Sequence, residues 1–213
     1  MPRAKTTGPA RRTRMSAEQR RDSILEAAAE VFAAKGYRAG KVSDVAARVG
    51  VSEPVIFQNF GSKAALYAAM LDRVAGEIQV ELTALVEHHG SASDLLTHAL
   101  DPSHGTRFHS PGSHGVLFAD AATLTAEPEL SEPTRRAVRT VAKHLGDLVR
   151  RGQADGDVRA DLDPEAAAWL LLSVLSTRPL RTAVMSDPDQ LEGRVAAVAL
   201  GALVAPTPAP PPA

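Results

Sequence analysis

The 213-residue sequence predicts an all-α protein of about nine helices. Aromatic residues make up only 4% of the chain, so the core must be built from Ala, Leu and Val, a composition that favours helices over sheets. Apolar residues recur at intervals of three and four along most of the chain, and no segment shows the alternation of a strand. Ser, Asp, Pro and Gly stand where these helices are expected to begin and end.

The N-terminal third predicts three helices followed by the start of a long fourth one. The first begins after Ser16 and ends at Gly36, because Ser is a good N-cap and Gly a good stop. Two short helices are expected over about 43–49 and 53–60. Ser62 is the expected N-cap of the fourth helix, whose apolar residues share one face over several turns.

The rest of the chain predicts further helices separated by polar loops. A weak helical pattern covers 92–100, a Gly- and Ser-rich loop covers 101–115, and helices are expected over 115–125 and 130–153. Two final helices begin near 164 and 188, where an Asp stands before a Pro suited to the first helical position. The first of these two is apolar nearly all round, which indicates burial on more than one side.

Charge and composition divide the chain unevenly. Residues 1–63 hold 12 Lys and Arg against 6 Asp and Glu, a net charge of +6, whereas the remainder is acidic, so the front of the chain suits a polyanion. Four parts are expected: a flexible basic arm over 1–15, a helix-turn-helix domain over 16–66, a larger helical domain over 67–204 and a disordered Pro-rich tail over 205–213.

Several classes of protein are excluded. The chain has no Cys, so disulfides, thiolate metal sites and a Cys nucleophile cannot occur. No apolar run is long enough to span a membrane and no signal peptide is visible, so a cytoplasmic protein is expected. Nucleophile elbows, phosphate loops and zinc-protease motifs do not occur either, which argues against an enzyme, and no cofactor is predicted.

The segment from 42 to 63 has helix-turn-helix spacing. Ala46 is small enough for a second helix to approach, Gly50 permits a turn with positive φ, Ser52 can cap the next helix, and Ile56 can pack back on the preceding one. A helical wheel of the second helix places Ile56 and Phe60 on its buried side, with Phe57 and Asn59 flanking. The outward face then consists of Pro54, Val55 and Gln58.

This segment, together with ILEAAAEVFAAKGY before it, resembles the DNA-binding domain of the TetR/AcrR family of transcriptional regulators, from about Arg21 to Leu71. The resemblance implies a homodimer that binds a double-stranded DNA operator and has a helical C-terminal domain for a small-molecule effector and for dimerisation. A repressor released from a palindromic operator by its effector is therefore expected. The alternative is a ligand-binding or sequestering protein with a vestigial DNA-binding head.

The helical wheel and the resemblance together predict the DNA contacts. Pro54, Val55 and Gln58 are expected to face the bases, and the residues expected to contact phosphates are Lys41, Ser52, Asn59 and Lys63. Lys63 matches the family's phosphate-contacting lysine, whereas Phe57 replaces a Tyr and cannot donate a hydrogen bond. Phe57 is expected to pack against a sugar or the domain core.

The effector and dimer sites are less specific. Phe118, His144 and Trp169 are the polarisable candidates for an effector pocket, and the dimer is expected to form through the helices that start near 164 and 188. His104, His109 and His114 are spaced by five within one loop, but without Cys or interleaved carboxylates they predict a solvated loop or a lid, and no metal site.

Overall fold

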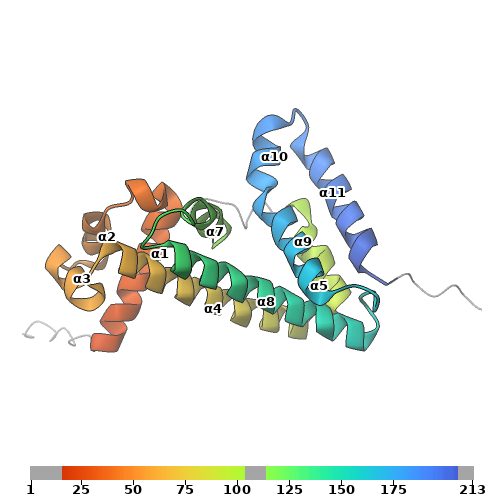
Figure 1. Cartoon of the computed structure of the whole chain (residues 1–213), viewed down its shortest axis with the longest axis horizontal. Helices are drawn as coiled ribbons and strands as arrows, with labels where there is room; N and C mark the ends of the chain where they lie inside the picture. The colour runs from red at the N-terminus through yellow and green to blue at the C-terminus, as the bar shows by residue number, and fades with distance from the viewer. Residues whose placement is uncertain (1–15, 104–113, 206–213) are drawn as a thin grey trace, which may run out of the picture.

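The structure, a computed structural model, describes residues 16–103 and 114–205, and it is almost entirely helical over these ranges (Figure 1). Within them, extended pairing is limited to one isolated bridge between Val158 and Val204. The helices are α1 (Ala17–Ala39), α2 (Val42–Val49), α3 (Glu53–Phe60), α4 (Lys63–His89), α5 (Ala92–Leu100), α7 (His114–Thr123), α8 (Ser131–Asp155), α9 (Pro164–Ser176), α10 (Arg178–Val184) and α11 (Pro188–Leu203). The predicted all-α class is confirmed.

Two long helices connect the ends of the molecule. α4 leaves the cluster formed by α1, α2 and α3 and packs along α8 (Figure 1). α5, α9, α10 and α11 gather at the opposite end, and α7 packs against α1. The predicted boundary between residues 66 and 67 lies inside α4, so the two expected domains share a helix. No linker therefore separates the part of α4 that packs on α8 from the N-terminal cluster.

The predicted helix caps are present with two adjustments. Ser16 accepts from the Gln19 N–H at 3.1 Å, and the Gln19 side chain accepts from the Ser16 N–H at 2.9 Å, which completes a capping box. Ser62 and the Asp residues before 164 and 188 also cap as expected. Gly36 (φ +71°) was expected to end the first helix, but it kinks α1, and one more turn follows it. Ser52 stands at the N-cap position of α3, but its hydroxyl makes no capping bond, so that prediction is wrong.

Helix α10 was not expected from the sequence. Its Arg178 and Arg181 suggest a solvated segment, yet the Arg178 side chain is 8% exposed and the Arg181 side chain 18%. Both converge on Glu192 of α11, and the Arg181 Nε and Nη2 atoms lie 2.6 and 2.9 Å from its carboxylate oxygens. This buried ion cluster fastens α10 to α11, a long-range contact that local sequence spacing does not reveal.

Some predictions fall outside the described residues. These are the basic arm over 1–15, the tail from 206 onward, and the His104 and His109 side chains of the loop. Residue 114 begins α7. Among the described residues, no group of three His, Asp or Glu could hold a metal ion.

Candidate functional site

A tight turn joins α2 to α3. Gly50 ends α2 with φ +77°, and its N–H donates to the Ala46 carbonyl at 3.0 Å. The space around Gly50 is open, so the glycine is needed for its left-handed backbone and not for close packing. Ile56 on α3 is 1% exposed and shares a core with Val45. The predicted helix-turn-helix is therefore present.

The exposed face of α3 is rotated from the predicted one. Its exposed residues are Glu53, Pro54, Phe57 and Gln58. Val55 is half-buried and is therefore a weaker part of the predicted outward face, whereas Phe57 is 42% exposed and belongs to that face. The wheel centred the buried side on Ile56 and Phe60, but Asn59 also turns inward. The buried side is thus broader than apolarity alone indicates, and the outward face shifts toward Phe57.

Asn59 is partly buried, and both its side chain and its backbone make hydrogen bonds. Its Nδ2 donates to the Val55 carbonyl at 2.7 Å within α3, and its backbone carbonyl accepts from Arg21 Nη1 at 2.9 Å. The Arg21 guanidinium also lies 4.3 Å from the centroid of the Phe60 ring, a cation–π distance. Arg21 of α1 therefore fastens the C-terminal end of α3, a role that the sequence analysis missed.

Polar groups at the starts of α2 and α3 remain accessible. Ser52 is exposed, and its hydroxyl is not used for capping. Lys41 is exposed, while its backbone N–H donates to the Asp44 carboxylate at 3.3 Å. Asp44 also pairs with Lys35 at 2.8 Å, and the Lys35 hydrogen bond holds the pKa of this carboxyl below its ordinary value. The Lys41 side chain thus projects from a fixed backbone position.

Lys63 lies at the first turn of α4 in a partly buried position. Its Nζ is 4.5 Å from the centroid of the Tyr37 ring and donates to the Arg38 carbonyl at 3.4 Å. Burial lowers the pKa of this ammonium. Because an ammonium has three N–H donors, the Arg38 bond leaves donors for another acceptor beside the free N–H groups of the helix start. This is a suitable place for a phosphate.

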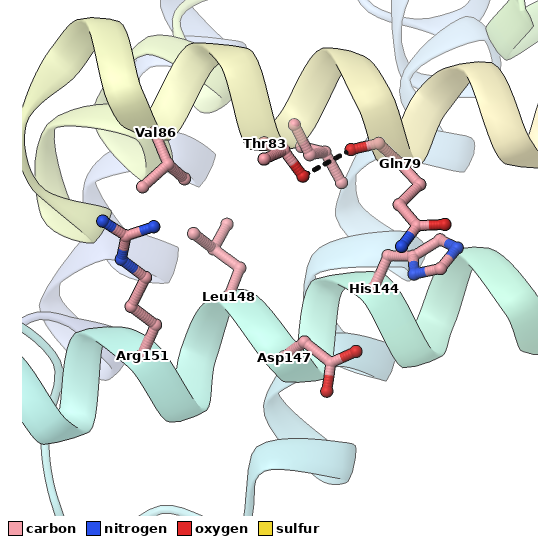
Figure 2. Close-up of a pocket in the computed structure, with 8 residues that line it drawn as sticks. Gln79, Thr83, Val86, His144, Asp147, Leu148 and Arg151 are labelled. Carbon is pink, nitrogen blue, oxygen red and sulfur yellow. Dashed lines mark hydrogen bonds between the residues drawn. The ribbon is translucent and has the colours of Figure 1, made fainter.

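A cavity of about 190 Å³ lies between α4 and α8 (Figure 2). Its lining residues are Gln79, Leu82, Thr83 and Val86 of α4, and His144, Asp147, Leu148 and Arg151 of α8. In Figure 2 the His144 ring lies beside the Gln79 amide, while the Arg151 guanidinium points toward Val86. The cavity thus has an apolar middle with hydrogen-bonding groups near both ends.

His144 is the group of this cavity with an unused hydrogen-bonding atom. Its Nε2 is buried and has no hydrogen-bond partner among the described residues. Burial lowers the pKa of the imidazole, the charge of Lys143 lowers it further, and Asp147 opposes them. Asp147 pairs with Lys143 at 2.9 Å and with Arg150, so its carboxylate is occupied outside the cavity. A neutral imidazole with a free ring nitrogen can bind a ligand group.

The three predicted pocket residues do not share one cavity. Trp169 lines a separate cavity of about 330 Å³ between α8 and α9, on a different part of α8 from His144. Phe118 is buried at 8% exposure and lines neither of these cavities. Of the three, His144 is the one with a buried ring nitrogen that has no hydrogen-bond partner among the described residues, and an effector role for any of them stays a prediction.

Exposed apolar side chains collect on the C-terminal helices. We call this set the C-terminal apolar surface: Trp169, Leu170, Leu180, Val184, Met185 and Val198. Each is at least 40% exposed, and Val198 reaches 74%. Exposed apolar side chains in this number on neighbouring helices are typical of a surface that another molecule covers.

Residues 24–70 match the model of bacterial regulatory proteins of the tetR family, and this range holds α2, the turn and α3. The chain belongs to the TetR family. The match starts and ends close to the limits of the resemblance seen in the sequence, about 21 to 71.

Several relatives of this TetR-family chain are transcriptional regulators. The HTH-type transcriptional activator FasR of Mycolicibacterium smegmatis is 28% identical over 144 residues, 68% of this chain and 65% of FasR. An HTH-type transcriptional repressor of Mycobacterium tuberculosis, Rv3405c, is 36% identical over 99 residues, 45% of this chain and 50% of the repressor. The matches thus span about half to two thirds of these curated relatives.

A solved structure shares the fold over most of its length. The transcriptional regulator FadR of Bacillus subtilis, solved in complex with stearoyl-CoA, superposes with a TM-score of 0.62 at 19% identity and covers 85% of this chain and 98% of its own. This similarity extends the fold assignment of the TetR-family chain beyond its helix-turn-helix. No helix in the described ranges has the length and apolarity required to cross a bilayer.

Proposed function

We propose that this TetR-family protein is a sequence-specific DNA-binding transcriptional regulator that places α3 in the major groove of an operator. The exposed face of α3 carries the proposal, because it is short and presents Gln58, whose amide can form a bidentate pair with adenine N6 and N7. Pro54 and Phe57 on the same face can contact thymine methyl groups. Val55, half-buried, would contribute less.

Phosphate contacts would hold this helix in register. Lys41 and Ser52 are exposed beside α3, and Lys63 offers unused donors at the start of α4. Asn59 spends one donor on Val55, so it would contribute its second N–H. The net charge of +6 over residues 1–63 adds attraction that is independent of sequence. A protein that binds the chromosome of a bacterium acts in the cytoplasm, and the proposal includes no catalytic step.

We propose that a small-molecule effector binds the cavity between α4 and α8. Leu82, Val86 and Leu148 suit an apolar moiety, while His144 and Arg151 suit a polar or anionic group. Support for an effector also comes from FadR, whose structure holds stearoyl-CoA. Because α4 continues into the N-terminal cluster, a ligand that separates α4 from α8 would displace α3.

The proposed regulator is a homodimer and a repressor. The C-terminal apolar surface lies on α9, α10 and α11, which include the helices starting at 164 and 188, and a second copy of the chain would cover it. Two copies of α3 would then contact half-sites about 34 to 36 Å apart, or a wider spacing if the heads spread. The relatives include both an activator and a repressor, so repression rests on the family expectation.

A binding titration tests this proposal. The protein is mixed with fluorescent DNA from its own upstream region and with random DNA of equal length, over a series of salt concentrations. We expect tighter binding to the upstream DNA and a footprint with an inverted repeat. Weak binding of equal strength to both DNAs, together with tight ligand binding, would instead support a ligand-sequestering protein with a vestigial head.

A further inference from the structure

Asp120 of α7 forms two hydrogen bonds that cross from the C-terminal part of the molecule to the N-terminal cluster. Its Oδ2 accepts the Tyr37 backbone N–H at 2.8 Å and the Tyr67 hydroxyl at 3.1 Å. Tyr37 follows the kink of α1, and Tyr67 lies in the second turn of α4. One carboxylate oxygen on α7 therefore holds both helices at the place where they meet.

The kink at Gly36 is shaped for this carboxylate. A Cβ added at Gly36 would lie 3.1 Å from Asp120 Oδ1, which is tighter than an ordinary contact, and the φ of +71° already disfavours a side chain. Tyr67 is completely buried, and burial followed by the charge of Asp120 raises the pKa of its phenol, so the hydroxyl keeps its proton and donates. The kink, the hydroxyl and the carboxylate form one fitted contact.

The same tyrosines support Lys63. The Tyr37 and Tyr67 rings pack edge to face with centroids 4.9 Å apart, and the Lys63 ammonium lies over the Tyr37 ring. The Lys63 ammonium also donates to the backbone carbonyl of Arg38. Arg38 directly follows Tyr37, whose backbone N–H donates to Asp120. A continuous chain of contacts therefore runs from α7 to the ammonium at the start of α4.

We propose that Asp120 is a positioning residue that couples α7 to DNA binding, by holding Tyr37 and Tyr67 so that Lys63 is aimed at a phosphate. The inference rests on the proposed phosphate contact of Lys63. Movement of α7 away from α1 and α4 would break both hydrogen bonds of Asp120 and release the support under the Lys63 ammonium. Loss of the Lys63 contact lowers affinity for every DNA sequence and removes about one unit from the slope of log affinity against log salt.

The test is a cycle of variants measured on random DNA over a salt series. Asp120→Ala removes the acceptor and should lower the salt slope by about one unit, the same change as Lys63→Ala. The double variant should have the slope of Lys63→Ala alone, because both substitutions remove the same phosphate contact. Tyr67→Phe keeps the ring and should lower the slope in the same direction by a smaller amount. Asp120→Asn retains an acceptor oxygen and should keep the wild-type salt slope.

Controls separate coupling from a simple loss of stability. Glu127→Gln breaks the exposed Arg38–Glu127 ion pair, which also joins the end of α1 to the segment after α7, and should leave the slope unchanged. Urea unfolding identifies conditions in which every variant is folded, and partial unfolding reduces the bound fraction without changing the slope. If folded Asp120→Ala keeps the wild-type slope, the coupling is contradicted while the proposed function stands. If the wild-type protein binds neither DNA, the proposed function and this inference both fail.

Discussion

The two ends of this molecule expose different kinds of surface to solvent. Phe57 on α3 is the only large apolar side chain of α1 to α3 that the described structure leaves exposed, and the same helix also exposes Glu53 and Gln58. At the other end, the C-terminal apolar surface exposes six large apolar side chains on or beside α9, α10 and α11. The first surface suits a hydrated, charged partner such as DNA, and the second suits a second protein copy.

The two ends also differ in how they bury polar groups. At the N-terminal end, Asp120 binds two neutral donors from Tyr37 and Tyr67. At the C-terminal end, Glu192 is buried between two ionised guanidinium groups. Removing one member of a buried ion cluster leaves uncompensated charge, whereas removing the Asp120 carboxylate leaves two neutral donors without their acceptor. The C-terminal end should therefore be the more sensitive to a single substitution.

The largest expected effect comes from Glu192→Ala. The substitution leaves Arg178 and Arg181 buried without their shared carboxylate, which costs about 3 to 5 kcal/mol on the scale of buried ion pairs. Urea unfolding measures the loss of unfolding free energy. The matched control is Asp161→Ala, which breaks the exposed pair with Arg159 and should cost far less than Glu192→Ala, because solvent screens this pair. Equal losses of unfolding free energy for the two variants would show that the buried Glu192 cluster is no more important for stability than the exposed Arg159–Asp161 pair.

A second effect should appear in dimerisation. Val198→Glu places a carboxylate on the C-terminal apolar surface and should weaken the dimer at least about tenfold, or about 1.4 kcal/mol, in sedimentation equilibrium. Val80→Glu on α4 is the control, because Val80 is exposed to a similar degree, 69% against 74%, outside that surface. A dimer unaffected by Val198→Glu would place the interface elsewhere.

The sequence predicted the N-terminal end well because its structure depends on local signals. The Ser16 and Ser62 caps and the Gly50 turn act within a few residues, and each is present. The exposed face of α3 was predicted less accurately, because Phe57 is 42% exposed and the end of the helix is held by Arg21, 38 residues away, through the Asn59 backbone carbonyl. Tertiary hydrogen bonds of this kind leave no periodic trace in the sequence.

The C-terminal end was harder to predict for the same physical reason. α10 was missed because its arginines find Glu192 only after the chain folds. The predicted pocket grouped Phe118, His144 and Trp169 by chemical type, whereas the fold separates them onto different cavities or into the core. The sequence analysis did not single out Asp120, because no local pattern indicates that its carboxylate bonds to Tyr37 and Tyr67.

The smallest expected effect concerns pH. Burial keeps the pKa of His144 below its ordinary value of 6.5, so the folded state favours the neutral imidazole. Its stabilising contribution is complete above about pH 6.5 and is lost as the pH falls toward the lower folded pKa. Lys143, Asp147 and Arg151 also line or face this region.

The difference between wild type and His144→Gln isolates this contribution. Urea unfolding at pH 7.5 and 5.5 should show a smaller loss of stability in the variant, because glutamine does not titrate. An identical pH dependence in both proteins would mean that the imidazole is solvated in the folded state and is not the buried ligand group that the proposed effector cavity requires.

The central claim is that α3 reads bases while neighbouring residues hold phosphates, and Gln58→Ala tests it most directly. Binding of wild type, Gln58→Ala and Lys63→Ala is measured on the operator and on random DNA. We expect Gln58→Ala to cost about 1 to 3 kcal/mol on the operator and little on random DNA, and Lys63→Ala to weaken both alike. An equal loss on both DNAs for Gln58→Ala would contradict base reading by the exposed face of α3.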